Sequence, residues 1–322
     1  MKKELSFRTD PWFPQSLGAP RDRGSVSPMS SSSAAAAAGT WRLGDLTVNR
    51  LGFGAMRLTG SLPFAKGSPS DRGQSIAVLR RAVELGVNHI DTAAFYFSAL
   101  RSANELINTA LAPYPDDLVI TTKVGPGRDS WGEWHSARPD QLRGQVEENL
   151  RQLGRDHLDV VNLRRRADQE SIAEHFGALA GLRDAGLIRH LGVSDVTVDQ
   201  LTEALLIAPV VCVQNRYGFD LREHDPVLRA CAEQGIAFVP FFAIAGPSRQ
   251  SGRRPPEPEP LLAVARRHGA TPAQIRLAWT LNQSPNVLAI PGTGNVAHLE
   301  ENVAAAALRL SPEDVTLLDA AA

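Results

Sequence analysis

From residue 41 onward, short apolar runs alternate with longer segments in which apolar and polar residues recur at helical spacing. The apolar runs are rich in β-branched residues and have the length of strands. Strands separated by helices pair in parallel through crossover connections, so this alternation predicts an α/β fold of the (β/α)8 TIM barrel type. A doubly wound sheet shares the same local pattern and is the alternative. The predicted strands are 50–55, 87–91, 118–123, 158–163, 188–194, 210–214, 236–241 and 287–291, and the predicted helices are 73–85, 101–112, 139–153, 170–185, 197–206, 224–234, 272–283 and 295–307.

Several helix starts carry a residue that is favoured at the N-cap. Asp71, Ser311 and the pair Thr271-Pro272 stand where such caps are expected. The side-chain oxygen of a cap accepts a hydrogen bond from a backbone N–H of the first turn, and proline fits the first helical position. These residues therefore support the helix boundaries.

The N-terminal segment differs from the rest of the chain. Residues 1–40 contain proline, serine, arginine and glycine without periodicity, so we expect a disordered tail followed by one barrel domain at 41–322. Two lysines near the N-terminus are not followed by the apolar core of a signal peptide. Met29 is an alternative natural start.

Charge and hydropathy exclude several classes of partner. The 322 residues include 34 Lys and Arg against 35 Asp and Glu, so the chain lacks the basic surplus of a nucleic-acid-binding protein. No run approaches the ~18 apolar residues of a membrane span. We expect a cytoplasmic protein that is a monomer or a weak homo-oligomer.

The cysteines and histidines indicate a protein of a reducing compartment without a metal site. Cys212 and Cys231 lie in apolar surroundings without metal-ligand spacing, which favours reduced core thiols in a reducing compartment. The 8 histidines are scattered and form no His-Glu-x-x-His motif, so no metal site is expected.

Candidate chemistry lies at the ends of two predicted strands. Asp91 ends the strand at 87–91, Tyr96 follows five residues later, and Lys123 ends the strand at 118–123. In a parallel barrel these ends share one rim, where barrel enzymes carry their active sites. A carboxylate would hold the lysine charged, and that charge would lower the tyrosine pKa toward neutrality for proton donation to a carbonyl. Spacing alone leaves open that Asp91 caps a helix, Tyr96 is core and Lys123 is a surface group.

Six motifs extend this pattern along the chain from about Leu46 to Leu318. Together they resemble the signatures of the aldo-keto reductase family, with the closest likeness to a bacterial branch that includes a pyridoxal reductase. The motifs are Arg50-Leu51-Gly52-Phe53-Gly54-Ala55-Met56, Ile90-Asp91-Thr92-Ala93 with Tyr96, Thr121-Thr122-Lys123, Gly192-Val193-Ser194-Asp195, Val213-Gln214-Asn215-Arg216-Tyr217, and Ile290-Pro291-Gly292-Thr293 through Glu301-Asn302.

The resemblance implies a barrel that binds NADPH without a Rossmann domain and reduces aldehydes or ketones. It assigns Tyr96 as the acid, Lys123 as its pKa partner and Asp91 as the residue that orients Lys123. The family usually has a histidine where this chain has Arg164. A guanidinium group can polarise a carbonyl and also favours an anionic substrate group, such as the phenolate of a pyridoxal. The alternative is that Arg164 faces outward as a solvated charge.

The resemblance also implies the cofactor contacts. Ser194, Asp195 and Gln214 would surround the nicotinamide amide, although Asp195 stands where asparagine is common, and Tyr217 would stack on the ring. Gln214 and Asp195 as helix caps, and Tyr217 as core, are the alternatives. Gly294 stands where a basic residue often meets the 2′-phosphate, so NADPH is expected with NADH as an alternative. The residues expected at the adenosine end are Gly292, Thr293, Asn295, Glu301 and Asn302, with His298 or arginines of the 246–260 loop as further phosphate ligands.

A long loop on the expected catalytic rim carries Trp131 and Trp134, which can stack on an aromatic carbonyl substrate or anchor the loop. Two other functions stay open. A nicotinamide-binding regulatory or redox-sensing barrel with little catalysis is motivated by the missing histidine. A barrel isomerase or aldolase would use Lys123 as a Schiff-base amine.

Overall fold

Seven parallel strands form the central sheet of the computed structural model, which describes residues 34–60, 68–128, 133–166, 169–244 and 256–321. Their order is β11-β10-β9-β8-β5-β4-β3, so strands of this sheet that follow one another along the chain are also adjacent in the sheet. The bounds are β3 Phe53–Gly54, β4 His89–Asp91, β5 Val119–Val124, β8 Leu158–Arg164, β9 Ile188–Ser194, β10 Val210–Gln214 and β11 Ala237–Phe238.

The eighth predicted strand, 287–291, closes the sheet through isolated bridges rather than a continuous ladder. Val287 pairs with Phe238 on one side, and Ala289 pairs with Leu51 on the other, both in parallel. The Arg50 guanidinium reinforces this closure by donating to the carbonyl oxygens of Leu281, Ser284 and Val287 at 2.5, 2.7 and 3.1 Å. The predicted (β/α)8 barrel is confirmed.

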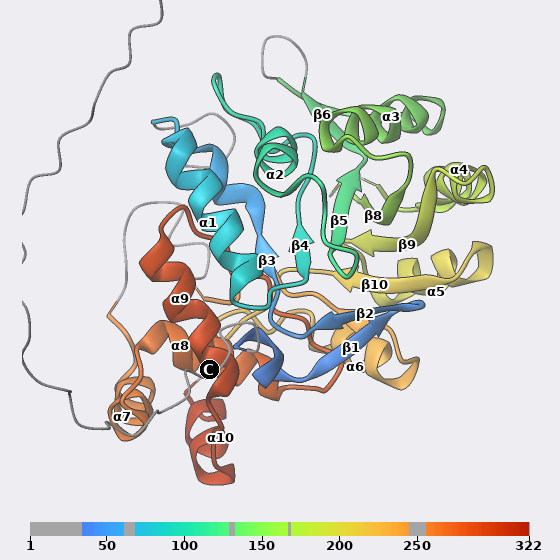
Figure 1. Ribbon diagram of the computed structural model, residues 1–322. Helices are drawn as coiled ribbons and strands as arrows, with labels where there is room; N and C mark the ends of the chain where they lie inside the picture. Colours follow the sequence, from blue (N-terminus) through green and yellow to red (C-terminus); the bar gives the residue numbers. More distant parts are fainter. Residues whose placement is uncertain (1–33, 61–67, 129–132, 167–168, 245–255, 322) are drawn as a thin grey trace, which may run out of the picture. The chain divides into compact units, whose positions relative to one another are not determined.

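Helices connect successive strands and lie outside them, as Figure 1 shows for α1 to α4. The three N-caps expected from the sequence are confirmed, because Asp71, Thr271 and Ser311 each accept a hydrogen bond from a backbone N–H of their helix. No helix in the described ranges is both long and apolar enough to cross a membrane. The bounds are α1 Arg72–Glu84, α2 Ala103–Leu111, α3 Leu142–Leu153, α4 Ala173–Asp184, α5 Val198–Ile207, α6 Asp225–Glu233, α7 Glu259–His268, α8 Pro272–Asn282, α9 Val296–Ala304 and α10 Pro312–Asp319.

Two hairpins were not among the predicted elements. The first joins β1 (Thr40–Leu43) to β2 (Leu46–Asn49), and its Leu43 and Val48 are fully buried. These two side chains belong to the apolar cluster that fills the barrel interior, so the hairpin covers one end of the barrel. The second joins β6 (Pro126–Arg128) to β7 (Trp134–Ser136) within the loop expected to carry the tryptophans.

The predicted tail, residues 1–40, lies mostly outside the described residues, but its last part is structured. Ala35–Ala38 form a short 3-10 helix, and Thr40 begins β1. Ala35 is fully buried, and its N–H donates to the carbonyl of Leu85 at 3.0 Å. Because Ala35 is buried against the barrel and bonded to it, the barrel unit begins before residue 41.

Candidate active site

Asp91 and Lys123 meet at the C-terminal ends of the neighbouring strands β4 and β5. The Lys123 ammonium donates to Asp91 Oδ1 at 2.6 Å and to the Thr92 carbonyl at 3.0 Å. Asp91 Oδ2 accepts from Gln214 Nε2 at 2.8 Å. Because Asp91 and Lys123 are only 3% and 4% exposed, this is a buried ion pair whose two charges are held by hydrogen bonds from three strands.

Tyr96 lies next to Lys123 of this ion pair. The Lys123 ammonium is 4.9 Å from the centroid of the Tyr96 ring, and Phe95 packs edge-to-face against the same ring at 5.2 Å. Burial raises the pKa of Tyr96 and outweighs the lowering by Lys123 and Arg164. This differs from the expected shift toward neutrality, because the desolvation of the phenolate is the larger effect. The tyrosine is therefore protonated at neutral pH, which is the form that donates a proton.

Lys123 and His89 respond differently to the same interior. Burial alone would lower the pKa of Lys123, but attraction to Asp91 and Tyr96 raises it above its usual value. Burial lowers the pKa of His89 to about 4, so this imidazole is neutral, and its Nε2 is 3.1 Å from Thr121 Oγ1. The barrel interior therefore contains a charged ammonium group and an uncharged imidazole.

Arg164 ends β8 and faces the site rather than open solvent. Its guanidinium donates to Ser194 Oγ at 3.1 Å and lies 3.3 Å from an Asp195 carboxylate oxygen. The guanidinium carbon is 5.0 Å from the centroid of the Phe241 ring. Burial lowers the pKa of Arg164, while Asp195 and Tyr96 oppose that effect. Arg164 therefore contacts Ser194, Asp195 and Phe241 and does not extend into solvent as the alternative expected.

A small cavity of about 260 Å³ lies beside these groups and combines aromatic with cationic walls. Trp134 is 41% exposed, and its ring packs edge-to-face on Phe95 at 5.8 Å. Trp131 lies outside the described residues. The cavity is lined by Phe95, Pro126, Trp134, Arg164, Arg165, Arg166 and Asp195.

Three of the expected nicotinamide contacts lie together at the ends of β9 and β10. Ser194 Oγ and the Asp195 N–H both donate to the Gln214 carbonyl, at 2.8 and 3.0 Å. Asp195 has a φ of 63°, a left-handed conformation that aspartate and asparagine tolerate better than most residues. Gln214 is 1% exposed, and its Oε1 is buried without a partner among the described residues. That oxygen can accept a hydrogen bond from a ligand amide.

Tyr217 does not share this location. Its ring is fully buried, stacks on Trp279 at 6.1 Å and contacts Phe238, while its hydroxyl donates to Asp225 at 2.8 Å. The residue belongs to the core, because Trp279 of α8 stacks on its ring and Phe238 of β11 packs edge-to-face against it. The aromatic ring that lies beside Arg164 is instead Phe241, which was not among the expected site residues.

A second cavity, of about 590 Å³, gathers most of the residues expected at the adenosine end. Gly292, Thr293, Glu301 and Asn302 line it, as does Gly294. Asn295 is not among the lining residues and instead caps α9, where its Oδ1 accepts from the His298 N–H at 3.1 Å. Glu301 Oε1 accepts from Thr271 Oγ1 at 2.5 Å, which fixes the orientation of that carboxylate.

Arg57 and His298 also line this cavity. His298 was an expected phosphate ligand, whereas Arg57 was not. Arg57 follows the predicted strand 50–55, and Phe241 ends the predicted strand 236–241. Barrel enzymes place functional residues at these C-terminal strand ends. Their positions at strand ends could therefore have identified both residues from the sequence.

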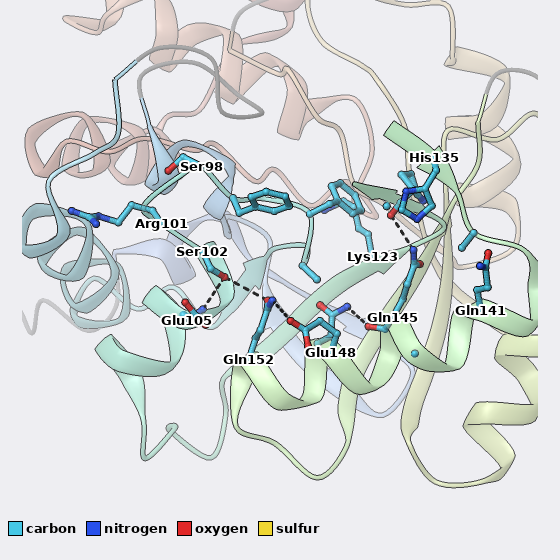
Figure 2. A pocket seen from close by; sticks show the side chains of 18 of the residues that line it. Ser98, Arg101, Ser102, Glu105, Lys123, His135, Gln141, Gln145, Glu148 and Gln152 are labelled. Carbon is cyan, nitrogen blue, oxygen red and sulfur yellow. Dashed lines mark hydrogen bonds between the residues drawn. The ribbon is translucent and has the colours of Figure 1, made fainter. Parts of the chain in front are cut away.

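A third cavity, of about 810 Å³, lies between the segment after β4 and helix α3. Figure 2 shows Lys123 at one wall and Gln145, Glu148 and Gln152 along α3 at the other. Lys123 thus lines this cavity, and its ammonium group also lies over the Tyr96 ring.

Comparisons with known proteins agree with this arrangement. The profile of the Aldo/keto reductase family matches residues 50–322. The chain belongs to this family. The predicted family, fold and enzyme class, an NAD(P)H-dependent oxidoreductase, are therefore confirmed.

Individual members of the family match over most of their length. A pyridoxine 4-dehydrogenase of Escherichia coli is 47% identical, covering 87% of this chain and 97% of that protein. An uncharacterized oxidoreductase of Schizosaccharomyces pombe is 41% identical, covering 88% and 90%. The structure of an aldo-keto reductase from Klebsiella pneumoniae in complex with NADPH is 27% identical, with a TM-score of 0.72 and coverage of 88% and 94%. The bacterial relative fits the expected branch.

Proposed function

We propose that this aldo-keto reductase uses NADPH to reduce aldehydes or ketones, with pyridoxal-like aromatic aldehydes as the favoured substrates. The observation that carries the proposal is the position of the Lys123 ammonium, 2.6 Å from Asp91 Oδ1 and 4.9 Å from the Tyr96 ring centroid. A protonated phenol beside an ammonium group is suited to giving its proton to a carbonyl oxygen.

The residues of the cofactor site fit a reduced nicotinamide dinucleotide. Gln214 Oε1, which has no partner among the described residues, matches an amide donor, and the Arg57 guanidinium gives the second cavity a positive charge that suits phosphate groups. His298 lines the same cavity and can donate a hydrogen bond to a phosphate oxygen. The Klebsiella relative was crystallised with NADPH, which supports NADPH over NADH. When bound, the cofactor supplies a hydride, which carries both electrons to the carbonyl carbon.

Each residue of the proposed catalytic set then has a defined part. Tyr96 gives its proton to the carbonyl oxygen and afterwards recovers one from solvent. Lys123 stabilises the transient phenolate, and Asp91 keeps Lys123 charged. Arg164 holds the carbonyl oxygen or a neighbouring anionic oxygen, since guanidinium offers several donors in one plane.

Aromatic aldehydes with an ionised oxygen suit the small cavity. Phe95 and Trp134 supply aromatic faces, and Arg164 supplies the charge that a phenolate requires. The Escherichia coli relative is named a pyridoxine 4-dehydrogenase, and pyridoxal is the aldehyde of that alcohol. Both observations favour pyridoxal as the first substrate to test.

The test is oxidation of NADPH and NADH, followed by absorbance, with pyridoxal, benzaldehyde and a small aldehyde panel. Tyr96→Phe is expected to lower kcat by about 10²–10⁴. Tyr114→Phe is the matched control, because the Tyr114 hydroxyl only donates to the Leu153 carbonyl at 2.7 Å. Arg164→His is expected to reduce the preference for pyridoxal over benzaldehyde. NADPH binding by fluorescence without any carbonyl turnover would indicate a cofactor-sensing barrel instead.

A further inference from the structure

A chain of buried hydrogen bonds lies behind Lys123, on the outer side of the sheet. Thr122 and Thr92 flank the ion pair in the sequence and, like Asn104 and Asn149, are fully buried. The Thr92 hydroxyl donates to Asn104 Oδ1 at 2.8 Å, and the Thr122 hydroxyl donates to Asn149 Oδ1 at 2.6 Å. Asn104 Nδ2 donates to the same Asn149 oxygen at 2.9 Å. The ends of β4 and β5 are thereby tied to α2 and α3.

Helix α3 also holds β5 on the other side of Lys123. Gln145 lies one turn before Asn149, whose Nδ2 donates to the Gln145 carbonyl at 2.9 Å. Gln145 Oε1 accepts from the Gly125 N–H at 2.7 Å. Gly125 has a φ of 117°, and a Cβ there would lie 2.6 Å from the Arg164 carbonyl, so its backbone has no room to move toward β8. Gln145 and Lys123 face the same cavity in Figure 2.

We propose that Asn104, Gln145 and Asn149 form a clamp that positions the catalytic ammonium group. This inference rests on the proposed function. The clamp residues act through the strand ends rather than on the carbonyl itself. Thr92 illustrates the effect, because its side chain is held by Asn104 while its carbonyl accepts from Lys123 at 3.0 Å.

Packing alone does not account for these residues. Burying hydroxyl and amide groups costs free energy, and replacing both partners of a buried hydrogen bond by apolar groups of similar shape can be nearly neutral. Apolar side chains would therefore pack α2 and α3 on β4 and β5 at a lower cost in free energy. What the hydrogen bonds add is a fixed direction for the two strand ends.

The Tyr96 pKa reports on the position of Lys123. The charged groups acting on Tyr96 are Lys123 from β5, Asp91 from β4 and Arg164 from β8. Lys123 and Arg164 lower the tyrosine pKa, whereas Asp91 and burial raise it. A loosened clamp lets the ammonium move away, so the Tyr96 pKa is expected to rise.

The experiment compares isosteric variants. Thr122→Val removes the hydroxyl that contacts Asn149, and Thr122→Ser retains it. Thr280→Val is the matched control, since Thr280 is equally buried but its hydroxyl only donates to the Arg276 carbonyl within α8 at 2.8 Å. Two measurements are made on each variant: kcat, KM and NADPH affinity with an aldehyde, and titration of Tyr96 by near-ultraviolet absorbance. The chain has only 3 tyrosines, so subtracting the Tyr96→Phe titration isolates Tyr96.

Thr122→Val is expected to lower kcat about tenfold, which corresponds to ~1.4 kcal/mol, with unchanged NADPH affinity and a raised Tyr96 pKa. Thr122→Ser should restore both quantities toward the parent values, and Thr280→Val should leave them unchanged. The clamp is refuted if Thr122→Val only lowers the melting temperature, as the control does, while the Tyr96 pKa stays in place. If the parent protein reduces no carbonyl, the proposed function fails, and the Tyr96 titration alone still decides whether the clamp positions Lys123.

Discussion

The buried pair of Asp91 and Lys123 provides the most direct test of the site's electrostatics. Asp91→Asn keeps the shape of the side chain and removes the charge that compensates an ammonium group only 4% exposed. Leaving one partner of a buried ion pair uncompensated costs ~3–5 kcal/mol. For a chain of this size, ~1 kcal/mol shifts the melting temperature by about 2 °C, so we expect a loss of about 6–10 °C at neutral pH.

The pH dependence separates this electrostatic cause from a packing defect. In the parent protein the Lys123 pKa is raised, so its stabilising contribution is complete below the usual lysine pKa of ~10.4 and disappears as pH rises through the folded-state value. Without the Asp91 charge, burial dominates and lowers the Lys123 pKa. The penalty is then complete below that lowered pKa and shrinks as pH rises toward ~10.4. The two melting temperatures should therefore converge between about pH 7 and pH 10.

Thermal unfolding followed by circular dichroism over this pH range measures both effects. Glu147→Gln is the matched control, because Glu147 forms an exposed ion pair with Arg143 at 3.5 Å that is worth at most ~0.5 kcal/mol. An Asp91→Asn loss below ~1 kcal/mol, or a difference that does not change with pH, would refute the view that Lys123 depends on this carboxylate for its charge.

Three further predictions concern other parts of the barrel. Tyr217→Phe should cost ~1 kcal/mol of stability through its lost hydrogen bond and leave the NADPH Kd unchanged. Phe241→Ala should raise that Kd several-fold in fluorescence titration. The reverse result would show that Tyr217, rather than Phe241, contacts the cofactor. Gly292→Ala places a Cβ 2.5 Å from the Gly54 carbonyl, so a stability loss of ~1–3 kcal/mol in urea unfolding is expected, and an unchanged midpoint would contradict the close approach. The pKa of His89 is lowered to about 4, so its neutral form contributes stability that is lost as pH falls from ~6.5 through 4. Over that pH range the melting temperature of His89→Gln should fall less than that of the parent protein. Equal decreases would exclude His89 as the cause of the acid destabilisation.

Local patterns in the sequence placed Asp91 and Lys123 at the ends of predicted strands, whereas Arg164 was identified through the family resemblance. Each stands at the end of a short apolar run, and a parallel barrel brings those ends to one rim whatever the side chains between them. The contact between Gln214 and Asp91 spans 123 residues, so no local pattern indicates it. The family resemblance, rather than spacing, led to Gln214.

The expectations that differed from the structure depend on packing between distant elements. Tyr217 follows β10 just as Phe241 follows β11, so both are aromatic residues at strand ends in the sequence. Only the position of Trp279 on α8 makes Tyr217 core. The lowering of the Tyr96 pKa by its neighbours was predictable from charge, whereas the larger effect of burial depends on how the surrounding segments cover the ring.

The closure of the barrel by Arg50 has a consequence for the synthesis of the chain. Arg50 leaves the ribosome early, but its partners Leu281, Ser284 and Val287 lie 231, 234 and 237 residues later. Until that late segment emerges, the sheet edges at β3 and β11 have no partners to close on, and open edges are templates for unwanted strand pairing. A nascent chain released before residue 287 would therefore contain all of the proposed catalytic groups in a barrel that cannot close. Such a chain is expected to be a substrate for chaperones and proteases rather than an enzyme.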